Sequence, residues 1–369
     1  SSPGISPGIF KDNSRCLTGL GERRSGTIQT VAIRPSNHGV VFMTSKQLRL
    51  RRGCARSAWA LLAACACVPA AEPPAAPKPM QEVIVIGITP VEGLGLPREK
   101  IAGHVRSVTA QDLQDSQSQD LTDYMNRNLG SVSINSAQNN PLQPDIQFRG
   151  FTASPLLGLP QGLAVYQDGA RINEPLGDAV NWDLIPQSAI NGINLIGGAN
   201  PLFGLNTLGG ALSIDMKNGF TFEGHQAEVS GGSWSRLIGN AESGGNNGTF
   251  GYYVNVRYFE EDGWRDLSES DATTVYGALS WRGERSTFDL GINWGDSFLT
   301  GNGALPIGQL AVDREAIFTA PDITENDMHM LTFEGTHDFN DELQVSGSGF
   351  WRENDTSSFN GDGSEFVAC

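Results

Sequence analysis

Cysteine is the residue type whose absence excludes most. The five cysteines are Cys16, Cys54, Cys65, Cys67 and Cys369, so none lies between residues 68 and 368. A disulfide framework and a thiolate metal site are therefore excluded for that long stretch.

The same stretch lacks the motifs of common enzymes. Its histidines, His104, His225, His329 and His337, never occur in the close spacing of a metal-ligand pair. Neither a G-x-S-x-G elbow nor a P-loop is present. Residues 260–262 are acidic, but they are expected in a solvated loop. We therefore predict a protein that is not an enzyme, with no catalytic residue, no metal site and no cofactor.

Long apolar runs and a basic body are also missing. No run of 18 apolar residues follows the N-terminal region, which argues against a multi-pass helical membrane protein. Residues 1–56 hold ten Lys and Arg against two Asp and Glu, whereas the remainder holds 15 against 39. This acidic body argues against nucleic acid as a partner.

The basic N-terminal region has the order of a secretory signal. Met43 is the first methionine; basic residues follow it, then apolar residues 58–68, then Pro-Ala-Ala at 69–71. We predict a signal peptide over 43–71 and upstream sequence that is not native over 1–42. An anchor helix and lipidation of Cys65 are the alternatives.

The segment after the signal is expected to be extended. Residues 72–79 are rich in proline and alanine and predict a linker. The β-branched run that follows favours a strand, which could also be an ordinary core strand. It consists of Glu82, Val83, Ile84, Val85, Ile86 and Gly87.

A stretch dense in glycine, residues 191–217, organises the rest of the chain. Two apolar runs, 193–196 and 211–216, flank a centre that is rich in glycine and asparagine. Glycine permits positive φ and close backbone approach. We predict two strands joined by a compact loop, for which a decorated hairpin in any β-rich protein is the simplest alternative.

The spacing of this stretch resembles the end of the plug domain of TonB-dependent outer-membrane receptors. The matching residues include Phe203, Gly204, Gly209 and Gly210, and upstream Arg149-Gly150 resembles the family's I-R-G-F strand end. Two positions depart from the family pattern. Asn194 stands where an acid is usual and Gly197 where arginine is usual, which puts the ion pair of those residues in doubt.

The resemblance implies a small mixed α/β plug domain over residues 88–220. Within it we expect a hairpin over 163–172 with an Asp-Gly turn. Thr109 and Ser118 are plausible N-caps for helices over 110–113 and 119–126. The resemblance also implies that residues 82–87 are the TonB box, which the TonB energy transducer would bind by strand addition within the linker, residues 72–87.

After residue 220 the pattern changes to strict alternation of apolar and polar residues. This pattern, with terminal aromatics, predicts antiparallel transmembrane β-barrel strands over 221–369; a soluble sandwich is the alternative. The turns are alternately short and long, as in outer-membrane barrels. We expect about seven strands of the roughly 22 in a plugged transporter, and so a fragment. They span about 225–233, 235–244, 249–259, 272–283, 285–297, 328–337 and 342–353.

The resemblance implies active import across the outer membrane of a Gram-negative bacterium. The imported solute would be a ferric siderophore or another metal chelate. The partners would be the TonB energy transducer, outer-membrane lipid and this solute. A passive porin or adhesin, or a glycan-binding surface β-protein, is the alternative. The plug's outward loops supply the candidate solute residues: Gln138, Asn139, Leu156, Leu157, Asn173, Glu174 and Asp178.

Overall fold

The computed structural model describes residues 85–87, 95–97, 103–340 and 343–361, all of which lie in one compact unit, Glu82–Gly363. The expected upstream sequence, signal peptide and most of the linker lie outside the described residues. Among the residues described, no helix combines the length and the apolar character that crossing a membrane requires.

The glycine-rich stretch forms the centre of a five-stranded sheet, with the order β3-β9-β10-β7-β8. β9 (Ile190–Gly197) and β10 (Gly210–Met216) pair antiparallel, which confirms the two strands expected from the apolar runs. β10 pairs in parallel with β7 (Leu163–Gln167), and β9 pairs antiparallel with β3 (His104–Thr109). The short β8 (Ala170–Arg171) forms the other edge.

The predicted Asp-Gly hairpin is confirmed. Asp168 and Gly169 have φ angles of 44° and 72°, the left-handed pair that a two-residue turn with the strands' own twist needs. A second sheet has three strands, which come between β3 and β7 in the sequence. It contains β4 (Val132–Asn135), β5 (Asp145–Phe148) and β6 (Phe151–Ala153).

The first helix, α1 (Ala110–Ser116), begins at the predicted N-cap. The Thr109 side chain accepts a hydrogen bond from the backbone N–H of Asp112, and the Asp112 carboxylate accepts one from that of Thr109. This reciprocal pair is a capping box. The helix is three residues longer at its C-terminus than predicted.

The second helix, α2 (Leu121–Asn128), begins later than predicted, because its N-cap is Asp120 and not Ser118. The Asp120 carboxylate accepts from the backbone N–H of Asp123 at 2.7 Å, and a carboxylate at that position also complements the helix dipole. Its apolar residues Leu121, Tyr124 and Met125 are buried. The remaining short helices are η2 (Trp182–Leu184), η3 (Gln187–Ala189), η4 (Pro201–Phe203) and α3 (Ile307–Leu310).

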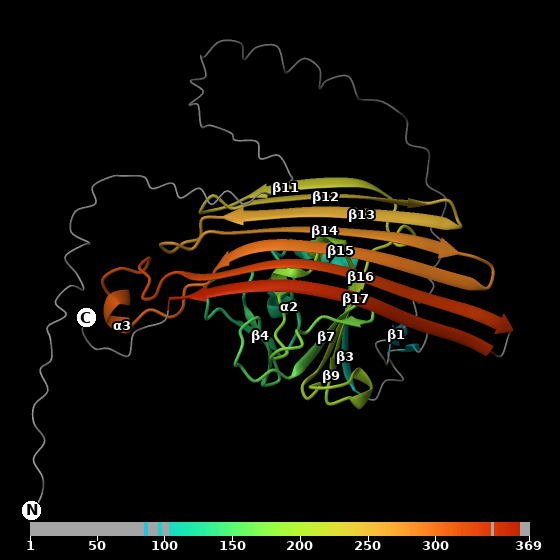
Figure 1. Ribbon diagram of the computed structural model, residues 1–369, viewed down its shortest axis with the longest axis horizontal. Coiled ribbons are helices and arrows are strands. Elements are labelled where there is room, and N and C mark those ends of the chain that lie inside the picture. Colours follow the sequence, from blue (N-terminus) through green and yellow to red (C-terminus); the bar gives the residue numbers. More distant parts are fainter. Residues whose placement is uncertain (1–84, 88–94, 98–102, 341–342, 362–369) are drawn as a thin grey trace, which may run out of the picture. The chain divides into compact units, whose positions relative to one another are not determined.

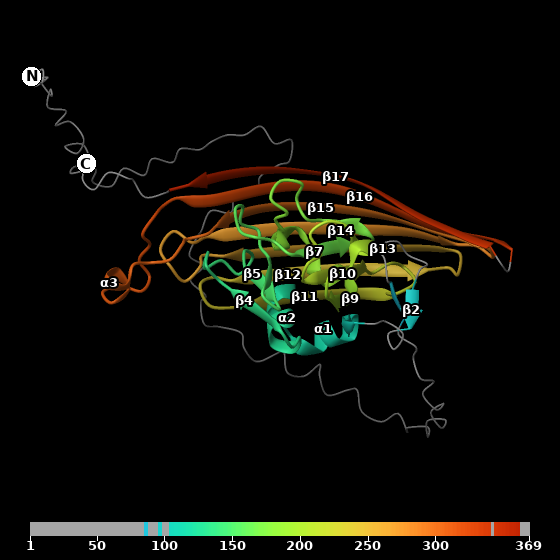
Figure 2. The ribbon, with the colours of Figure 1, turned by 90° about the horizontal axis from the view of Figure 1, so that it is seen from below.

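Seven antiparallel strands follow the plug, each paired with the next in sequence. Figure 1 shows them as one broad sheet beside the elements of the plug, and Figure 2 shows the same arrangement from below. They are β11 (Gly224–Gly231), β12 (Leu237–Asn246), β13 (Phe250–Glu261), β14 (Ser270–Arg282), β15 (Ser286–Thr300), β16 (Asp322–Asn340) and β17 (Leu343–Asn360).

The last two strands are longer than the alternation predicted. β16 and β17 pair from Asp322 opposite Asn360, although strands were expected only over 328–337 and 342–353. The added segments carry mainly polar residues, so the apolar signal stops while backbone pairing continues. One cross-strand bond, from Thr356 Oγ1 to Asn326 Oδ1 at 2.8 Å, lies in this extension.

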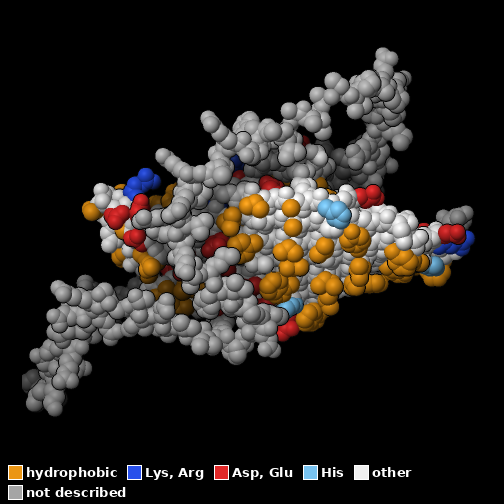
Figure 3. Space-filling view, turned by 90° about the horizontal axis from the view of Figure 1, so that it is seen from above, with side chains coloured by type: hydrophobic (Ala, Val, Ile, Leu, Met, Phe, Trp, Pro, Cys, Tyr) orange, Lys and Arg blue, Asp and Glu red, His pale blue; other side chains and the backbone are white. Residues whose placement is uncertain are grey.

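The two faces of the sheet differ as the alternation predicts. Along β13, Tyr252, Val254 and Val256 are exposed, whereas Tyr253 and Asn255 between them are buried. Figure 3 shows hydrophobic side chains spread over the outer face of the sheet. The outer face is therefore an apolar band, and the inner face carries many polar side chains against the plug.

The outer face becomes acidic toward the end of the sheet that carries the long loops. Asp296 of β15 lies directly opposite Asp327 of β16, which lies opposite Asp355 of β17. All three residues are exposed. Like charges directly opposite each other in a sheet are unfavourable, and exposure to water reduces that cost.

The plug contacts the inner face of the sheet through η2. Trp182 and Leu184 belong to one buried apolar cluster together with Tyr276, Met328 and other sheet residues. The fit is close at Gly295, where an added Cβ would lie 3.0 Å from Leu184 Cδ2. This side of the plug is held by packed apolar side chains.

A buried carboxylate lies in the same contact. Asp183 accepts hydrogen bonds from Ser297 Oγ at 2.7 Å and from Asn326 Nδ2 at 3.0 Å. The two side chains that donate to it are neutral, and burial raises the pKa of Asp183. The contact therefore costs stability when this carboxylate is ionised.

Gly210→Ala tests the close approach of the two central plug strands. Gly210 has a φ of 146°, and an added Cβ would lie 2.1 Å from the carbonyl oxygen of Ile196. We expect the variant to lose about 1–3 kcal/mol of unfolding free energy or more, because strain and a backbone clash add. Urea unfolding in detergent micelles measures the loss. Gly130→Ala is the control, since open space surrounds that position; equal losses would contradict the assignment.

Asp183→Asn tests the buried carboxylate. Because the folded-state pKa is raised, the folded plug retains a proton that the unfolded chain has lost, so stability falls as the pH rises through that pKa. The asparagine stays neutral, so the variant should gain stability at pH 8 and little at pH 4. Thermal unfolding at both pH values measures this. The exposed Asp115, changed to Asn, is the control, and a gain for Asp183→Asn that does not depend on pH would refute the explanation.

Candidate functional site

The described half of the predicted TonB box is a strand. β1 (Val85–Gly87) pairs antiparallel with β2 (Gly95–Pro97), while residues 82–84 lie outside the described residues. Within the part of the chain that is described, this sheet has only two strands, so each keeps one open edge. An open edge can accept a further strand by main-chain hydrogen bonds. The role of the segment in binding TonB stays a prediction.

The predicted solute loops of the plug are joined near Asp145 of β5. The Asp145 carboxylate accepts from Asn135 Nδ2 and from Ser154 Oγ. The backbone N–H of Val180 donates to Ser154 O at 2.9 Å, which brings the loop after β8 to the loop after β6. Three loops that are distant in the sequence therefore belong to one region.

The first loop is attached to the end of the sheet that carries the long loops. Asn140 Nδ2 donates to Ser270 Oγ at 2.8 Å and to Thr300 O at 3.1 Å. Gln138 lies against Gly301, where an added Cβ would be 2.9 Å from its Oε1. Asn139, with a φ of 58°, stays half-exposed in the turn.

The second loop presents apolar side chains to solvent. Leu157 is 64% exposed and Leu156 is half-buried. Leu157 lies against Gly177 of the third loop, where an added Cβ would meet its Cδ2 at 2.9 Å. The neighbouring Leu176 is 75% exposed. These two loop tips together form an exposed apolar surface.

In the third loop, Asn173 and Asp178 form hydrogen bonds within the plug. Asn173 is buried; it accepts from the backbone N–H of Val165 at 2.7 Å and donates to Leu163 O at 3.0 Å. Asp178 accepts from Arg171 Nη2 and from Asn206 Nδ2, both at 2.8 Å. Their polar atoms hold the loop in shape, which the sequence could not indicate.

Glu174 connects the same loop to the sheet. Both of its carboxylate oxygens accept from Arg352 of β17, at 2.7 and 3.0 Å, and Oε1 also accepts from Asn354. A bidentate pair of this kind fixes geometry as well as charge. Glu174 thus connects the plug to the inner face of the seven-stranded sheet.

The two departures from the family pattern in the plug motif are accommodated without an ion pair between them. Asn194 accepts from Ser107 Oγ at 2.8 Å and donates to Asp215 Oδ2 at 3.3 Å, so it links three neighbouring strands. At Gly197 an added Cβ would lie 3.0 Å from Arg149 Nη1. The Arg149 side chain therefore occupies the space beside this glycine.

The remaining motif residues build the compact loop. Phe203 is buried, and its carbonyl accepts a hydrogen bond from the hydroxyl of Tyr166, whose pKa is raised by burial. Gly204 has a φ of 78° and Gly150 one of 87°. At Gly209 an added Cβ would meet the Phe151 side chain at 2.5 Å. Glycine is needed here both for the left-handed backbone and for space.

Sequence reasoning missed the residues that fasten the plug to the sheet. Asp183 and Arg352 are far in the chain from their partners, and no local motif marks them. One signal was present: Arg352 sits at an inward position of a predicted strand, where a charged residue needs a partner.

The described residues contain no group of three or more His, Cys, Asp or Glu side chains that could hold a metal ion. The polar and apolar groups of the outward loops can instead contact a solute by hydrogen bonds and apolar surface.

Comparison with known proteins agrees with this fold. Residues 97–211 match the family model described as TonB-dependent Receptor Plug Domain. No curated protein matches significantly.

Solved structures resemble the chain over plug and strands. The ferric-catecholate import receptor Fiu from E. coli K12 matches with a TM-score of 0.57 and 17% identity, over 72% of this chain and 40% of that one. The ferric yersiniabactin uptake receptor FyuA from Yersinia pestis matches with 0.56 and 16%, over 71% and 42%. FpvA from P. aeruginosa, bound to heterologous pyoverdines, matches with 0.60 and 16%, over 73% and 36%.

The chain thus spans about two fifths of the length of these structures, and at this identity the likeness concerns the fold. Within that fold, the glycine-rich stretch, the capped helices and the Asp-Gly hairpin all lie inside the matched family segment or at its boundary. Residues 97–211 are therefore a TonB-dependent receptor plug domain, and the seven strands after it have the fold of the barrel wall of such receptors.

Proposed function

We propose that this chain forms the plug and the leading wall strands of an outer-membrane receptor of a Gram-negative bacterium. The receptor imports a ferric siderophore or another metal chelate, with energy from TonB. One observation carries the proposal most directly. A plug domain is fastened to the polar inner face of a sheet whose outer face is apolar. That combination is typical of a β-barrel whose outer face contacts lipid and whose interior is filled by a plug.

Closure of the wall is part of this proposal. Among the described residues, β11 and β17 each pair with only one strand. Open sheet edges in lipid leave backbone groups without hydrogen bonds. Further strands, to a total of about 22, would close the barrel around the plug.

The class of solute is inferred from two supports. Two of the similar structures, Fiu and FyuA, are receptors for ferric catecholate and ferric yersiniabactin. The outward loops of this chain offer amides at Gln138 and Asn139 and apolar surface at Leu156 and Leu157. Such a lining suits a chelate with both polar and apolar parts, while Asn173, Glu174 and Asp178 hold the loops in place.

The energy partner is inferred from residues 82–87. They lie between the proline-rich linker and the plug, and the described part forms a strand with one open edge. Addition of this segment to a sheet of TonB would let a pulling force reach the plug directly.

Deletion of residues 82–87 tests energised import. Uptake of the ferric siderophore by cells that produce the full-length receptor should be abolished, while binding at the cell surface at 4 °C stays unchanged. Removal of six residues from the linker, 73–78, is the control for chain length. Uptake that survives the first deletion would indicate the passive pore instead.

Leu157→Asp tests the apolar loop tip. A carboxylate there would remove apolar contact with the solute, and loss of about 1 kcal/mol corresponds to roughly fivefold weaker binding. Equilibrium binding of a panel of ferric siderophores to isolated outer membranes measures it. Leu205→Asp is the matched control, because Leu205 is 82% exposed but lies in the plug-motif loop. Equal weakening by both variants would remove Leu157 from the site.

A further inference from the structure

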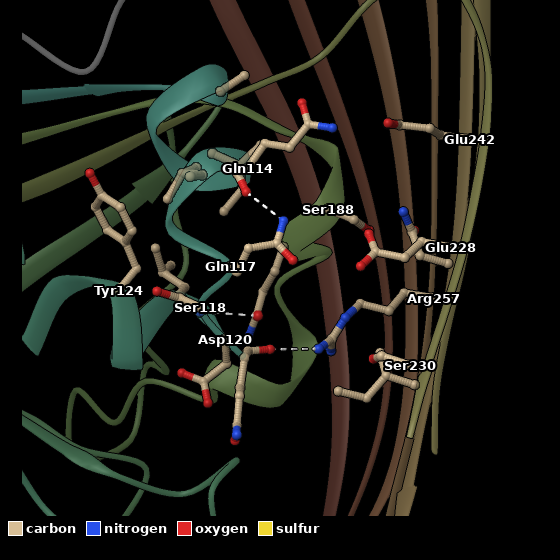
Figure 4. Close-up of a pocket in the computed structure, with 18 of the residues that line it drawn as sticks. Gln114, Gln117, Ser118, Asp120, Tyr124, Ser188, Glu228, Ser230, Glu242 and Arg257 are labelled. Atoms are coloured by element: carbon tan, nitrogen blue, oxygen red, sulfur yellow. Dashed lines mark hydrogen bonds between the residues drawn. The ribbon is translucent and has the colours of Figure 1, made fainter. Parts of the chain in front are cut away.

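Each face of the seven-stranded sheet carries a cavity, and the two differ in chemistry. The inner one, of about 930 Å³, lies between the plug and β11–β13 and is lined mainly by polar side chains. Figure 4 shows Asp120 of the plug facing Glu228 and Arg257 of the sheet across it. Arg257 Nη2 donates to Gln119 O at 3.1 Å. This inner cavity is part of the boundary between the plug and the sheet.

The outer face carries the second cavity, of about 730 Å³, which we call the outer hollow. It lies over β12–β16, near the end of the sheet that carries the short turns, on the face that Figure 3 shows. Its volume lies within the range of roughly 300–1,000 Å³ that is usual for small-ligand sites. Its outward apolar side chains include those of Phe250, Tyr252, Leu279, Trp281, Phe288 and Leu290.

The outer hollow belongs to a complete part of the sheet. Each of the strands β12 to β16 pairs with another strand on both of its sides. The hollow is therefore not a product of the open edges at β11 and β17. It is a feature that these five strands retain when further strands pair with the edges.

Two aromatic rings form one side of the hollow. A Cβ added to Gly335 of β16 would lie 2.7 Å from Cδ1 of Phe288, and one added to Gly283 would lie 2.8 Å from Cη2 of Trp281. The rings stack on each other, with centroids 5.4 Å apart and planes inclined by 16°. Glycine on β16 and in the turn thus gives both rings room to lie flat beside the hollow.

The floor of the hollow is aliphatic. Leu279 of β14 and Leu290 of β15 lie directly opposite each other, and both are exposed. On the other side, the Tyr252 ring lies against Gly245 of β12, where an added Cβ would be 3.6 Å from its Cε1. Because Tyr252 leans toward β12 and Phe288 toward β16, the space above the two leucines stays open.

The end of the hollow at the short turns is polar. Asn246 and Asn247 line it there. Asn247 Oδ1 accepts from the backbone N–H groups of Thr249 and Phe250, at 3.0 and 2.7 Å, which turns its Nδ2 away from the turn. Arg285, in the neighbouring short turn on the same rim, is exposed. An amide donor and a positive charge therefore lie at the rim, and the apolar groups lie further along the strands.

The opposite end of the outer face has the opposite charge. Asp296, Asp327 and Asp355 lie side by side there, and all three are exposed. A ligand that carries a phosphate is attracted by an arginine and repelled by carboxylates. The charge of the outer face thus favours such a ligand at the short-turn end only.

We propose that the outer hollow binds a glycerophospholipid. An acyl chain lies over Leu279 and Leu290 between the aromatic rings, and the phosphate accepts hydrogen bonds from Asn247 and Arg285. Short turns of outer-membrane barrels face the periplasm, so the lipid comes from the inner leaflet of that membrane. This inference rests on the outer-membrane location in the proposed function, and it does not depend on import.

The headgroup contacts decide whether the lipid is retained. An acyl chain gains no hydrophobic free energy when it leaves one hydrocarbon environment for another, because lipid tails are as apolar as leucine. Close packing against the flat rings and charge-assisted hydrogen bonds to the phosphate must therefore distinguish this lipid from its neighbours. Both parts of the site can be altered separately.

Gly335→Ala tests the packing, because its Cβ displaces the Phe288 ring from β16 toward the hollow. The full-length receptor, freed of lipid in a neutral detergent, is titrated with phosphatidylglycerol that carries brominated acyl chains. Bromine quenches tryptophan fluorescence on contact, and Trp281 borders the hollow. Half-saturation should need several-fold more lipid in Gly335→Ala than in the unchanged receptor. Gly239→Ala is the control, since it lies on the outer face of β12 in open space.

Two further variants identify the site. Trp281→Phe should abolish the saturable part of the quenching and leave a constant background from the other tryptophans. Arg285→Gln should weaken binding several-fold, because the phosphate loses its charged partner. Arg314→Gln, which changes an exposed arginine between β15 and β16 at the other rim, is the matched control. Resistance to unfolding by SDS at room temperature checks that each variant is folded.

The outcomes separate this site from general contact with lipid. Equal binding by Gly335→Ala and Gly239→Ala, or saturable quenching that survives Trp281→Phe, refutes the outer hollow as the site. Equal binding by Arg285→Gln and Arg314→Gln refutes the assignment of the phosphate. A protein that co-purifies with the receptor and blocks the quenching refutes lipid as the occupant. Uptake that does not depend on residues 82–87 refutes only the import function, because the titration needs no transport.

Discussion

Consecutive side chains of each wall strand point to opposite faces, and the rest of the structure depends on this alternation. It gives the sheet an apolar outer face and a largely polar inner one. A plug that contacts such an inner face is held by hydrogen bonds and ion pairs as well as by apolar packing. Polar contacts can be exchanged for contacts with water at small net free energy, so each of them adds little to the stability of the attachment. At η2 the attachment is apolar instead, because Trp182 and Leu184 are buried together with side chains of the sheet.

The sequence predicted those parts of the fold that depend on neighbours in the chain. The seven wall strands follow from period-two alternation, the Asp168-Gly169 turn from residues that tolerate positive φ, and the first helix from Thr109 as its cap. β16 and β17 were predicted too short, because their polar ends carry no apolar pattern. The cap of α2 was placed at Ser118 because a hydroxyl and a carboxylate two residues apart are equally good candidates.

The candidate site was less predictable, because its residues differ in role for reasons that are not local. Leu157 and Glu174 are both loop residues of suitable chemistry, yet one faces solvent and the other binds Arg352, 178 residues away in the chain. The buried Asp183, and Arg257 with its partner Gln119, likewise acquire their roles from contacts with other elements. Residue type and loop position can suggest a set of candidate residues. Only the three-dimensional structure shows which of them stabilise their own loop, which bind the sheet and which are exposed to a solute.

The level of aspartates on the outer face has a further consequence for a wall in a bilayer. Asp296, Asp327 and Asp355 lie side by side above the apolar band, and carboxylates resist transfer into hydrocarbon. The sheet consequently cannot sink inward past this level, and the apolar band below it cannot rise into water. The level of these carboxylates would thereby set the immersion depth of the wall, without any contribution from the plug.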